Sequence, residues 1–199
     1  MSAGMQRLAS SSPAALGLIA LLGVTALVYW PGLGGAFLFD DWSNLPLIGM
    51  LGPIDDLQTL IIYLLSGFSG PTGRPLSHLS FLIDARDWPT APEAFKRTNL
   101  LIHLLMGGVL FGLARSISCA LDVPAERAAR VALLTTAFWL LHPLWVSTTL
   151  YTVQRMTQLS TLFVLLGLWL YVRTRLQQPL ALSPRPVSYT HLRAHETVL

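Results

Sequence analysis

The chain has 199 residues, of which 53% are hydrophobic and only 12% are charged, and its formal net charge is +3. This composition, with a mean hydropathy of +0.56, excludes a typical soluble domain and indicates membrane-spanning helices. The basic residues are scattered and form no cluster interleaved with aromatic residues, so the sequence predicts no nucleic-acid partner. The single cysteine, Cys119, cannot form an internal disulfide.

Four stretches are apolar over most of the roughly 20 residues that a helix needs to cross a lipid bilayer. They cover residues 13–30, 99–114, 131–146 and 157–172. We therefore predict an all-α fold: a polytopic helical membrane protein with about four transmembrane helices, in one domain that extends over residues 1–186.

The arginines indicate the orientation of these spans. They gather in the short link between the second and third spans and after the fourth, on what the positive-inside rule makes the cytoplasmic side. Residues 31–96 then form a long external loop. Within this loop residues 56–67 are apolar but too few to cross the bilayer, which predicts a helix lying in the membrane interface.

The end of the chain has a different character. The stretch "VSYTHLRAHET", residues 187–197, resembles a translated sequencing adapter rather than a natural terminus. We therefore treat residues 187–199 as an artefact and give His191 and His195 no weight as metal ligands. This interpretation predicts that the source gene continues differently after about residue 186.

Two neighbouring carboxylates, Asp40 and Asp41, follow the first span on the external side. Adjacent side chains do not normally point the same way, so one of the two is expected to enter a site. A carboxylate there could act as a general base on an acceptor hydroxyl, or hold a divalent cation such as Mg²⁺ or Mn²⁺; a solvated turn is the alternative. Arg74, in the same loop, suits a lipid-linked phosphate, with a surface arginine as the alternative.

Other polar residues lie within or beside the spans. Asn99 and His103 are four residues apart and share one helix face, where helix–helix hydrogen bonding is the alternative to a ligand site. His142 precedes Pro143 at the end of the third span, where a proline-linked bend is the alternative to a ligand site. Arg155 lies at the external end of the fourth span, although the positive-inside rule favours basic residues on the cytoplasmic side. An anionic ligand would be one reason to retain it.

Taken in order, these segments resemble a known family. They are an Asp-Asp pair after the first span, "RPL" and then "F" in the external loop, "NLLIH" starting the second span, "LLHPLWV" ending the third and "VQR" starting the fourth. Over about residues 37–175 the chain resembles the N-terminal membrane region of the transmembrane and tetratricopeptide repeat-containing proteins. These are O-mannosyltransferase-like members of the GT-C glycosyltransferase superfamily, and the "VQR" form is closer to their bacterial relatives.

The resemblance implies a membrane enzyme, here in a bacterial inner membrane, that uses a polyprenyl-phosphate sugar donor and a protein or glycan acceptor on the extracytoplasmic face. It assigns Asp40 and Asp41 to the acidic motif with base or metal function. Six further residues match motif positions and would bind substrate or phosphate: Arg74, His78, Asn99, His103, His142 and Arg155. It also implies further spans and tetratricopeptide repeats after residue 186, without which the chain would be inactive.

Two other classes of function remain open. A non-catalytic membrane scaffold or assembly protein would use the same spans and polar residues for packing alone. A transporter would need polar groups along a path at the midplane of the bilayer, whereas these residues collect at the external face. If the chain belongs to an enzyme, Asp40 and Arg74 should converge on one cavity.

Overall fold

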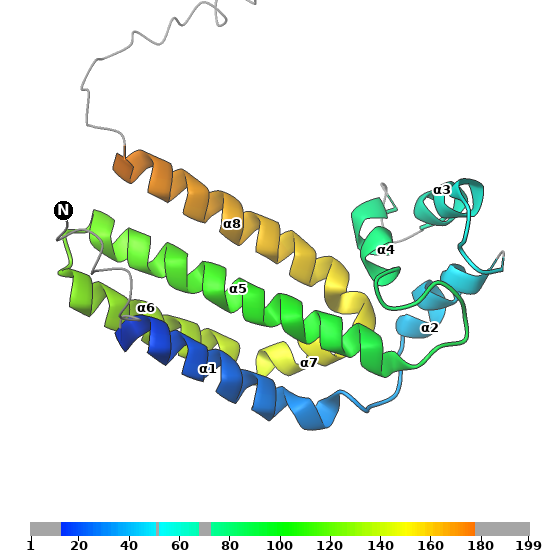
Figure 1. The fold of residues 1–199 in the computed structure, drawn as a ribbon, viewed down its shortest axis with the longest axis horizontal. Helices are drawn as coiled ribbons and strands as arrows, with labels where there is room; N and C mark the ends of the chain where they lie inside the picture. The colour runs from blue at the N-terminus through cyan, green and yellow to red at the C-terminus, as the bar shows by residue number, and fades with distance from the viewer. Residues whose placement is uncertain (1–12, 51, 68–72, 178–199) are drawn as a thin grey trace, which may run out of the picture.

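The computed structural model describes residues 13–50, 52–67 and 73–177, and this part of the chain contains helices and loops but no β-strand (Figure 1). The predicted all-α fold is therefore confirmed. The adapter-like residues 187–199 lie outside the described residues.

Four long helices form the body of the molecule: α1 (Pro13–Tyr29), α5 (Pro92–Ala120), α6 (Ala125–Leu140) and α8 (Arg155–Gln177). α5 packs against the other three, with α8 on one side of it and α1 and α6 on the other (Figure 1). Glycines on α5 allow this close approach. A Cβ atom at Gly107 would lie 2.8 Å from the side chain of Leu140, and one at Gly112 would lie 2.6 Å from the ring of Trp169.

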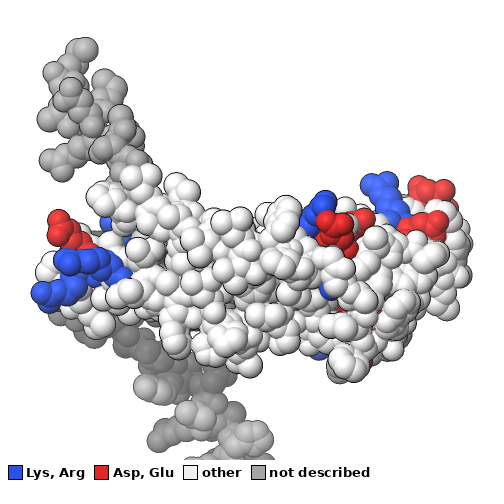
Figure 2. Space-filling model, turned by 90° about the horizontal axis from the view of Figure 1, so that it is seen from below, with Lys and Arg blue, Asp and Glu red and all other residues white. Residues whose placement is uncertain are grey.

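Among the described residues, three helical stretches are long and apolar enough to cross a membrane: Pro13–Gly32, Pro92–Ala120 and Thr152–Leu176. A fourth is added if α6 and the short helix α7 (Leu144–Leu150) count as one bent span. Each predicted span falls on one of these. Figure 2 shows charged side chains at the two ends of the molecule, with a broad uncharged band between them on the face in view. The membrane setting and the orientation of the helices stay predictions.

The predicted third span, residues 131–146, is divided between α6 and α7, which meet at a bend of 68°. The bend follows from Pro143, which has no backbone N–H and whose ring clashes with a continuing helix. Leu144 N donates to Nδ1 of His142 at 3.2 Å, so the carbonyl of Leu140 loses the partner that a straight helix would give it.

In the part that the structure describes, the connection between α1 and α5 contains five short helices at one end of the bundle. They are the 3₁₀ helix η2 (Trp30–Gly32), α2 (Asp41–Asn44), the 3₁₀ helix η3 (Leu45–Gly49), α3 (Leu57–Leu65) and α4 (Pro75–Phe81) (Figure 1). α3 begins with a capping box, in which the Asp56 carboxylate accepts a hydrogen bond from Thr59 N at 2.7 Å. α3 coincides with the helix predicted over residues 56–67, and its place in a membrane interface stays a prediction.

A hydrophobic cluster joins this connection to the bundle. Its buried members come from the connection, from the start of α5 and from the residues around the start of α8: Phe37, Leu45, Ile48, Ile54, Tyr63, Phe81, Phe95, Val153 and Met156. Burying side chains of this size stabilises their arrangement by roughly 1.5–3 kcal/mol each. The connection is therefore a packed layer over one end of the bundle, and it holds the polar residues there in fixed positions.

Candidate functional site

Five of the eight predicted site residues meet at residues 151–156, the segment that contains the 3₁₀ helix η4 (Thr152–Gln154) and the start of α8. Arg155 belongs to this segment, and the other four contact it through hydrogen bonds: Asp40, Asp41, Arg74 and Asn99. The segment follows α7 and lies beside the packed connection. It is the point where the candidate site is assembled.

Asp41 is fully buried and binds backbone on both sides. Its Oδ2 accepts a hydrogen bond from Leu38 N at 2.9 Å, and its Oδ1 accepts one from Val153 N at 2.7 Å. Burial raises the pKa of the Asp41 carboxyl, and these hydrogen bonds and the nearby charge of Lys96 oppose that rise. Asp41 thus ties the start of α2 to the 151–156 segment.

Asp40 is exposed, so the two neighbouring carboxylates point in different directions, as expected. The backbone N–H of Asp40 donates to the hydroxyl oxygen of Tyr151 at 2.8 Å. Burial raises the pKa of the Tyr151 hydroxyl, and the negative charges of Asp40 and Asp41 add to the rise. An exposed carboxylate and a phenol that keeps its proton therefore lie side by side at the surface.

Backbone strain accompanies two of the predicted site residues. Among the described residues that are not glycine, three have positive φ: Phe39 at 34°, Arg74 at 53° and Asp122 at 57°. Phe39 directly precedes Asp40, and Arg74 is itself the N-cap of α4. Such conformations cost of order 1–3 kcal/mol each and cluster at functional sites, so the surrounding packing must hold Asp40 and Arg74 where they are.

Arg74 lies at the edge of a groove of about 500 Å³ between α4 and α8. The groove combines hydroxyl groups with apolar side chains, and its other lining residues are Pro75, Leu76, Ser77, Met156, Thr157, Leu159, Ser160, Thr161 and Phe163. Nη1 of Arg74 is 3.5 Å from Sδ of Met156, a weak contact. Asp40 does not line this groove, so the expected convergence of Asp40 and Arg74 on one cavity is not found. The two residues contact only the same 151–156 segment, at Tyr151 and Met156.

Arg155 is fully buried and its guanidinium is engaged at every nitrogen. Nη2 lies 2.6 Å from Oδ2 of Asp84 and donates to Phe95 O at 2.7 Å. Nε donates to Oδ1 of Asn99 at 2.7 Å, and Nη1 donates to Ser80 O at 2.9 Å. The structure therefore supplies a protein counter-ion where the sequence predicted an anionic ligand, and the pair fastens the connection to α5 and α8.

Asn99 continues this network into the segment. Its Nδ2 donates to the backbone oxygens of Tyr151 and Thr152, at 3.2 Å each. Because its Oδ1 is held by Arg155, both ends of the Asn99 amide are used within the protein. Asn99 fixes the position of Tyr151 rather than facing a ligand.

The three predicted histidines make their contacts elsewhere in the protein. His103 Nε2 is 3.1 Å from Leu140 O, the carbonyl freed by the bend, and His142 caps the start of α7 through its Nδ1. His78 is fully buried against the ring of Tyr63, and neither of its ring nitrogens has a hydrogen-bond partner among the described residues. Burial lowers the pKa of His78. Within the described part of the chain, none of the three forms a hydrogen bond or a ring contact with the 151–156 segment.

Asp40 and Asp41 are the residues predicted to hold a divalent cation. Both oxygens of Asp41 already accept backbone hydrogen bonds, whereas the Asp40 side chain is exposed and is hydrogen-bonded to the Tyr151 hydroxyl. In the described part of the chain, no three His, Cys, Asp or Glu side chains form a group that could hold a metal ion. Mg²⁺ and Ca²⁺ take about six or more oxygen ligands, so a divalent cation beside Asp40 stays a prediction.

Sequence reasoning missed two charged residues that build the site. Asp84 is the counter-ion of Arg155, and Lys96 is buried with its Nζ donating to Gly35 O at 2.7 Å and Ala36 O at 3.0 Å. The sequence does contain a pattern that indicates Asp84 as the partner of Arg155. The predicted topology leaves Arg155 on the external side without a partner, and Asp84 is an external acid set in an apolar run, "SFLIDA".

Comparison of the chain with models of protein families, with curated proteins and with solved structures finds no match. Function is therefore inferred from the residues, their geometry and the motif order described above.

Proposed function

We propose that the chain is part of a membrane glycosyltransferase of the GT-C type. It transfers a sugar from a polyprenyl-phosphate donor to a hydroxyl of a protein or glycan, on the extracytoplasmic side of a bacterial inner membrane. The observation that supports this most is the exposed Asp40 carboxylate beside the 151–156 segment, with the groove of Arg74 against the same segment.

Asp40 is the general base of this reaction. The acceptor hydroxyl attacks the anomeric carbon of the sugar, a new C–O bond forms, and the bond from that carbon to the donor phosphate breaks. The acceptor oxygen must lose its proton as it attacks, and an exposed carboxylate can take it. Asp41 cannot share this role, because its oxygens are held by Leu38 and Val153, and it acts instead as a positioning residue.

Arg74 and its groove receive the donor. The leaving phosphate carries negative charge, and a guanidinium can bind it through two parallel hydrogen bonds. The hydroxyls of Thr157 and Ser160 line the same groove, and Leu159 and Phe163 extend its apolar wall along α8. A polar head with an apolar extension is the shape of a polyprenyl phosphate.

The test compares Asp40→Asn with Asp55→Asn in the complete product of the source gene, with transfer measured in membranes at matched protein levels. Asp55 is an exposed carboxylate of the same connection and has no hydrogen bond or ion pair to the 151–156 segment among the described residues, so it controls for the loss of charge. Asp40→Asn should lower the transfer rate about a hundredfold or more, the usual share of general acid–base catalysis. Asp55→Asn should leave the rate unchanged. Normal transfer by Asp40→Asn would exclude Asp40 as the base.

A second candidate, a non-catalytic membrane scaffold, is favoured by one observation. The polar atoms of Asn99, His103 and Arg155 bind other parts of the same chain, so packing alone accounts for these residues. A scaffold gives no reason for an exposed carboxylate behind a strained Phe39. The transfer rate of Asp40→Asn therefore separates the two candidates.

A further inference from the structure

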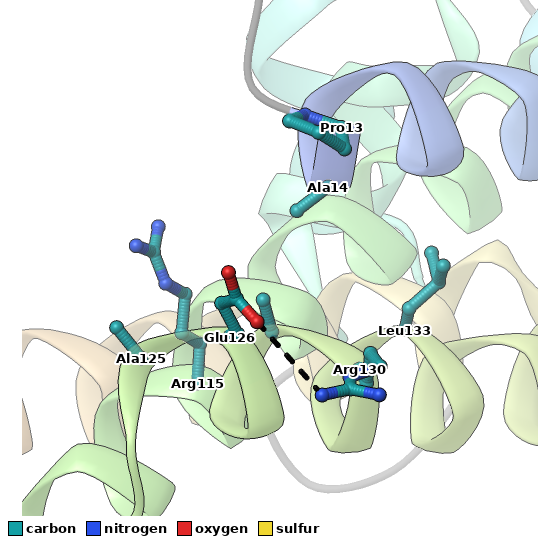
Figure 3. A pocket seen from close by; sticks show the side chains of 8 residues that line it. Pro13, Ala14, Arg115, Ala125, Glu126, Arg130 and Leu133 are labelled. Atoms are coloured by element: carbon teal, nitrogen blue, oxygen red, sulfur yellow. Dashed lines mark ion pairs between the residues drawn. The ribbon is translucent and has the colours of Figure 1, made fainter.

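A second hollow lies at the other end of the bundle, where the start of α1, the end of α5 and the start of α6 meet (Figure 3). Its volume is about 500 Å³, within the range of small-molecule sites. Small and apolar side chains form its walls: Pro13, Ala14, Ala125, Ala129 and Leu133. The ends of three candidate membrane helices meet here, which is the level at which lipid headgroups lie.

Three charged side chains complete the lining: Arg115, Glu126 and Arg130. Figure 3 shows Glu126 between the two arginines, with its ion pair to Arg130 drawn as a dashed line. That pair is 4.0 Å long and both side chains are exposed, so it contributes little and other groups can replace it. Arg115 lines the hollow and has no hydrogen bond or ion pair to any described residue, so no described partner competes with a ligand for its donors.

We infer that this hollow binds a glycerophospholipid whose headgroup carries a phosphate beside a primary ammonium, as in phosphatidylethanolamine. The phosphodiester oxygens accept hydrogen bonds from Arg115, and the ammonium donates to Glu126. The apolar walls contact the glycerol and the first carbons of the acyl chains. A purely anionic headgroup would put its charge next to the Glu126 carboxylate, and a quaternary ammonium has no N–H to donate to it.

The inference rests on the part of the proposed function that places these helices in a membrane. It concerns the end of the bundle opposite Asp40, and its test measures lipid binding without any transfer activity. The two can therefore fail separately.

The test uses native mass spectrometry of the complete chain in mild detergent. Phosphatidylethanolamine, phosphatidylglycerol and phosphatidylcholine with identical acyl chains are added in turn. Phosphatidylethanolamine should bind about tenfold tighter than the other two, since a hydrogen bond to a charged group contributes roughly that factor. Glu126→Gln should remove this preference, and Arg115→Gln should weaken all three lipids about tenfold.

Matched controls change the same charges at the same end of the bundle but outside the hollow. Asp122→Asn removes an exposed acid and Arg175→Gln removes an exposed cation, and both should bind the lipids as the unaltered chain does. Three outcomes would overturn the inference. They are equal or tighter binding of phosphatidylglycerol, losses in the controls as large as those in the site variants, and loss of the preference when residues 1–12 are deleted, since that segment would then form the site.

Discussion

The buried pair of Arg155 and Asp84 gives a stability prediction whose size follows from the contacts. The exposed fraction of the Arg155 side chain is 0% and that of Asp84 is 4%, so neither charge is compensated by solvent. Asp84→Asn keeps the shape of the side chain but leaves the guanidinium with no counter-ion. Removing one partner of a buried pair costs about 3–5 kcal/mol. Because Arg155 keeps its three hydrogen bonds to Asn99, Ser80 and Phe95, we expect about 3 kcal/mol, the lower end of that range.

The loss is measured as the free energy of unfolding in mixed micelles titrated with sodium dodecyl sulfate, followed by far-ultraviolet circular dichroism. The matched control is Glu93→Gln, which breaks the ion pair to Arg97. The side chains of that pair are 51% and 58% exposed, so its loss should cost no more than about 1 kcal/mol.

A double variant tests whether the charge itself is responsible. Arg155→Met with Asp84→Asn leaves no buried charge, so the double variant should be about 2 kcal/mol more stable than the sum of the two single losses, within the usual size of coupling between contacting residues. If Asp84→Asn is as stable as the unaltered chain, or if the two losses simply add, the pair does not fasten the connection to the bundle and the reasoning is refuted.

Three further predictions concern single residues. Burial lowers the pKa of His78, so below about pH 6.5, the ordinary histidine value, the unfolded chain binds a proton that the folded chain excludes. The free energy of unfolding should fall on acidification by up to about 1.4 kcal/mol per pH unit, and the His78→Gln variant should lack this contribution to the pH dependence. The same pH dependence in the variant and the unaltered chain would contradict the prediction. His103→Leu removes a partner of the Leu140 carbonyl and should cost about 1–3 kcal/mol, read from the same titration; no loss would mean that the Tyr29 hydroxyl alone satisfies this carbonyl. Reporter fusions at Gly70 and Leu121 should report opposite sides of the membrane. If both fusions report the same side, the proposed topology is wrong.

The sequence by itself determined the helices. Apolar runs of sufficient length predicted the four helical stretches, because a helix satisfies the hydrogen bonds of its backbone within four residues and needs no distant partner. The same local reasoning offered a bend at Pro143 as the alternative to a ligand site at His142, and it predicted that Asp40 and Asp41 point apart. Each of these properties depends on neighbours along the chain, and the printed sequence contains those neighbours.

Only the tertiary structure decided which side chains meet. Asp41 binds Val153 across 112 residues of chain, and Arg155 finds Asp84 rather than a ligand. Such pairs form because the packing of α5 against α8 brings separate segments to one end of the bundle, and no periodicity in the sequence reports that packing. From the sequence, Asp40 and Arg155 were equal candidates. The fold brings both to the 151–156 segment but in different surroundings: Asp40 is exposed, and Arg155 is buried as part of the packed frame.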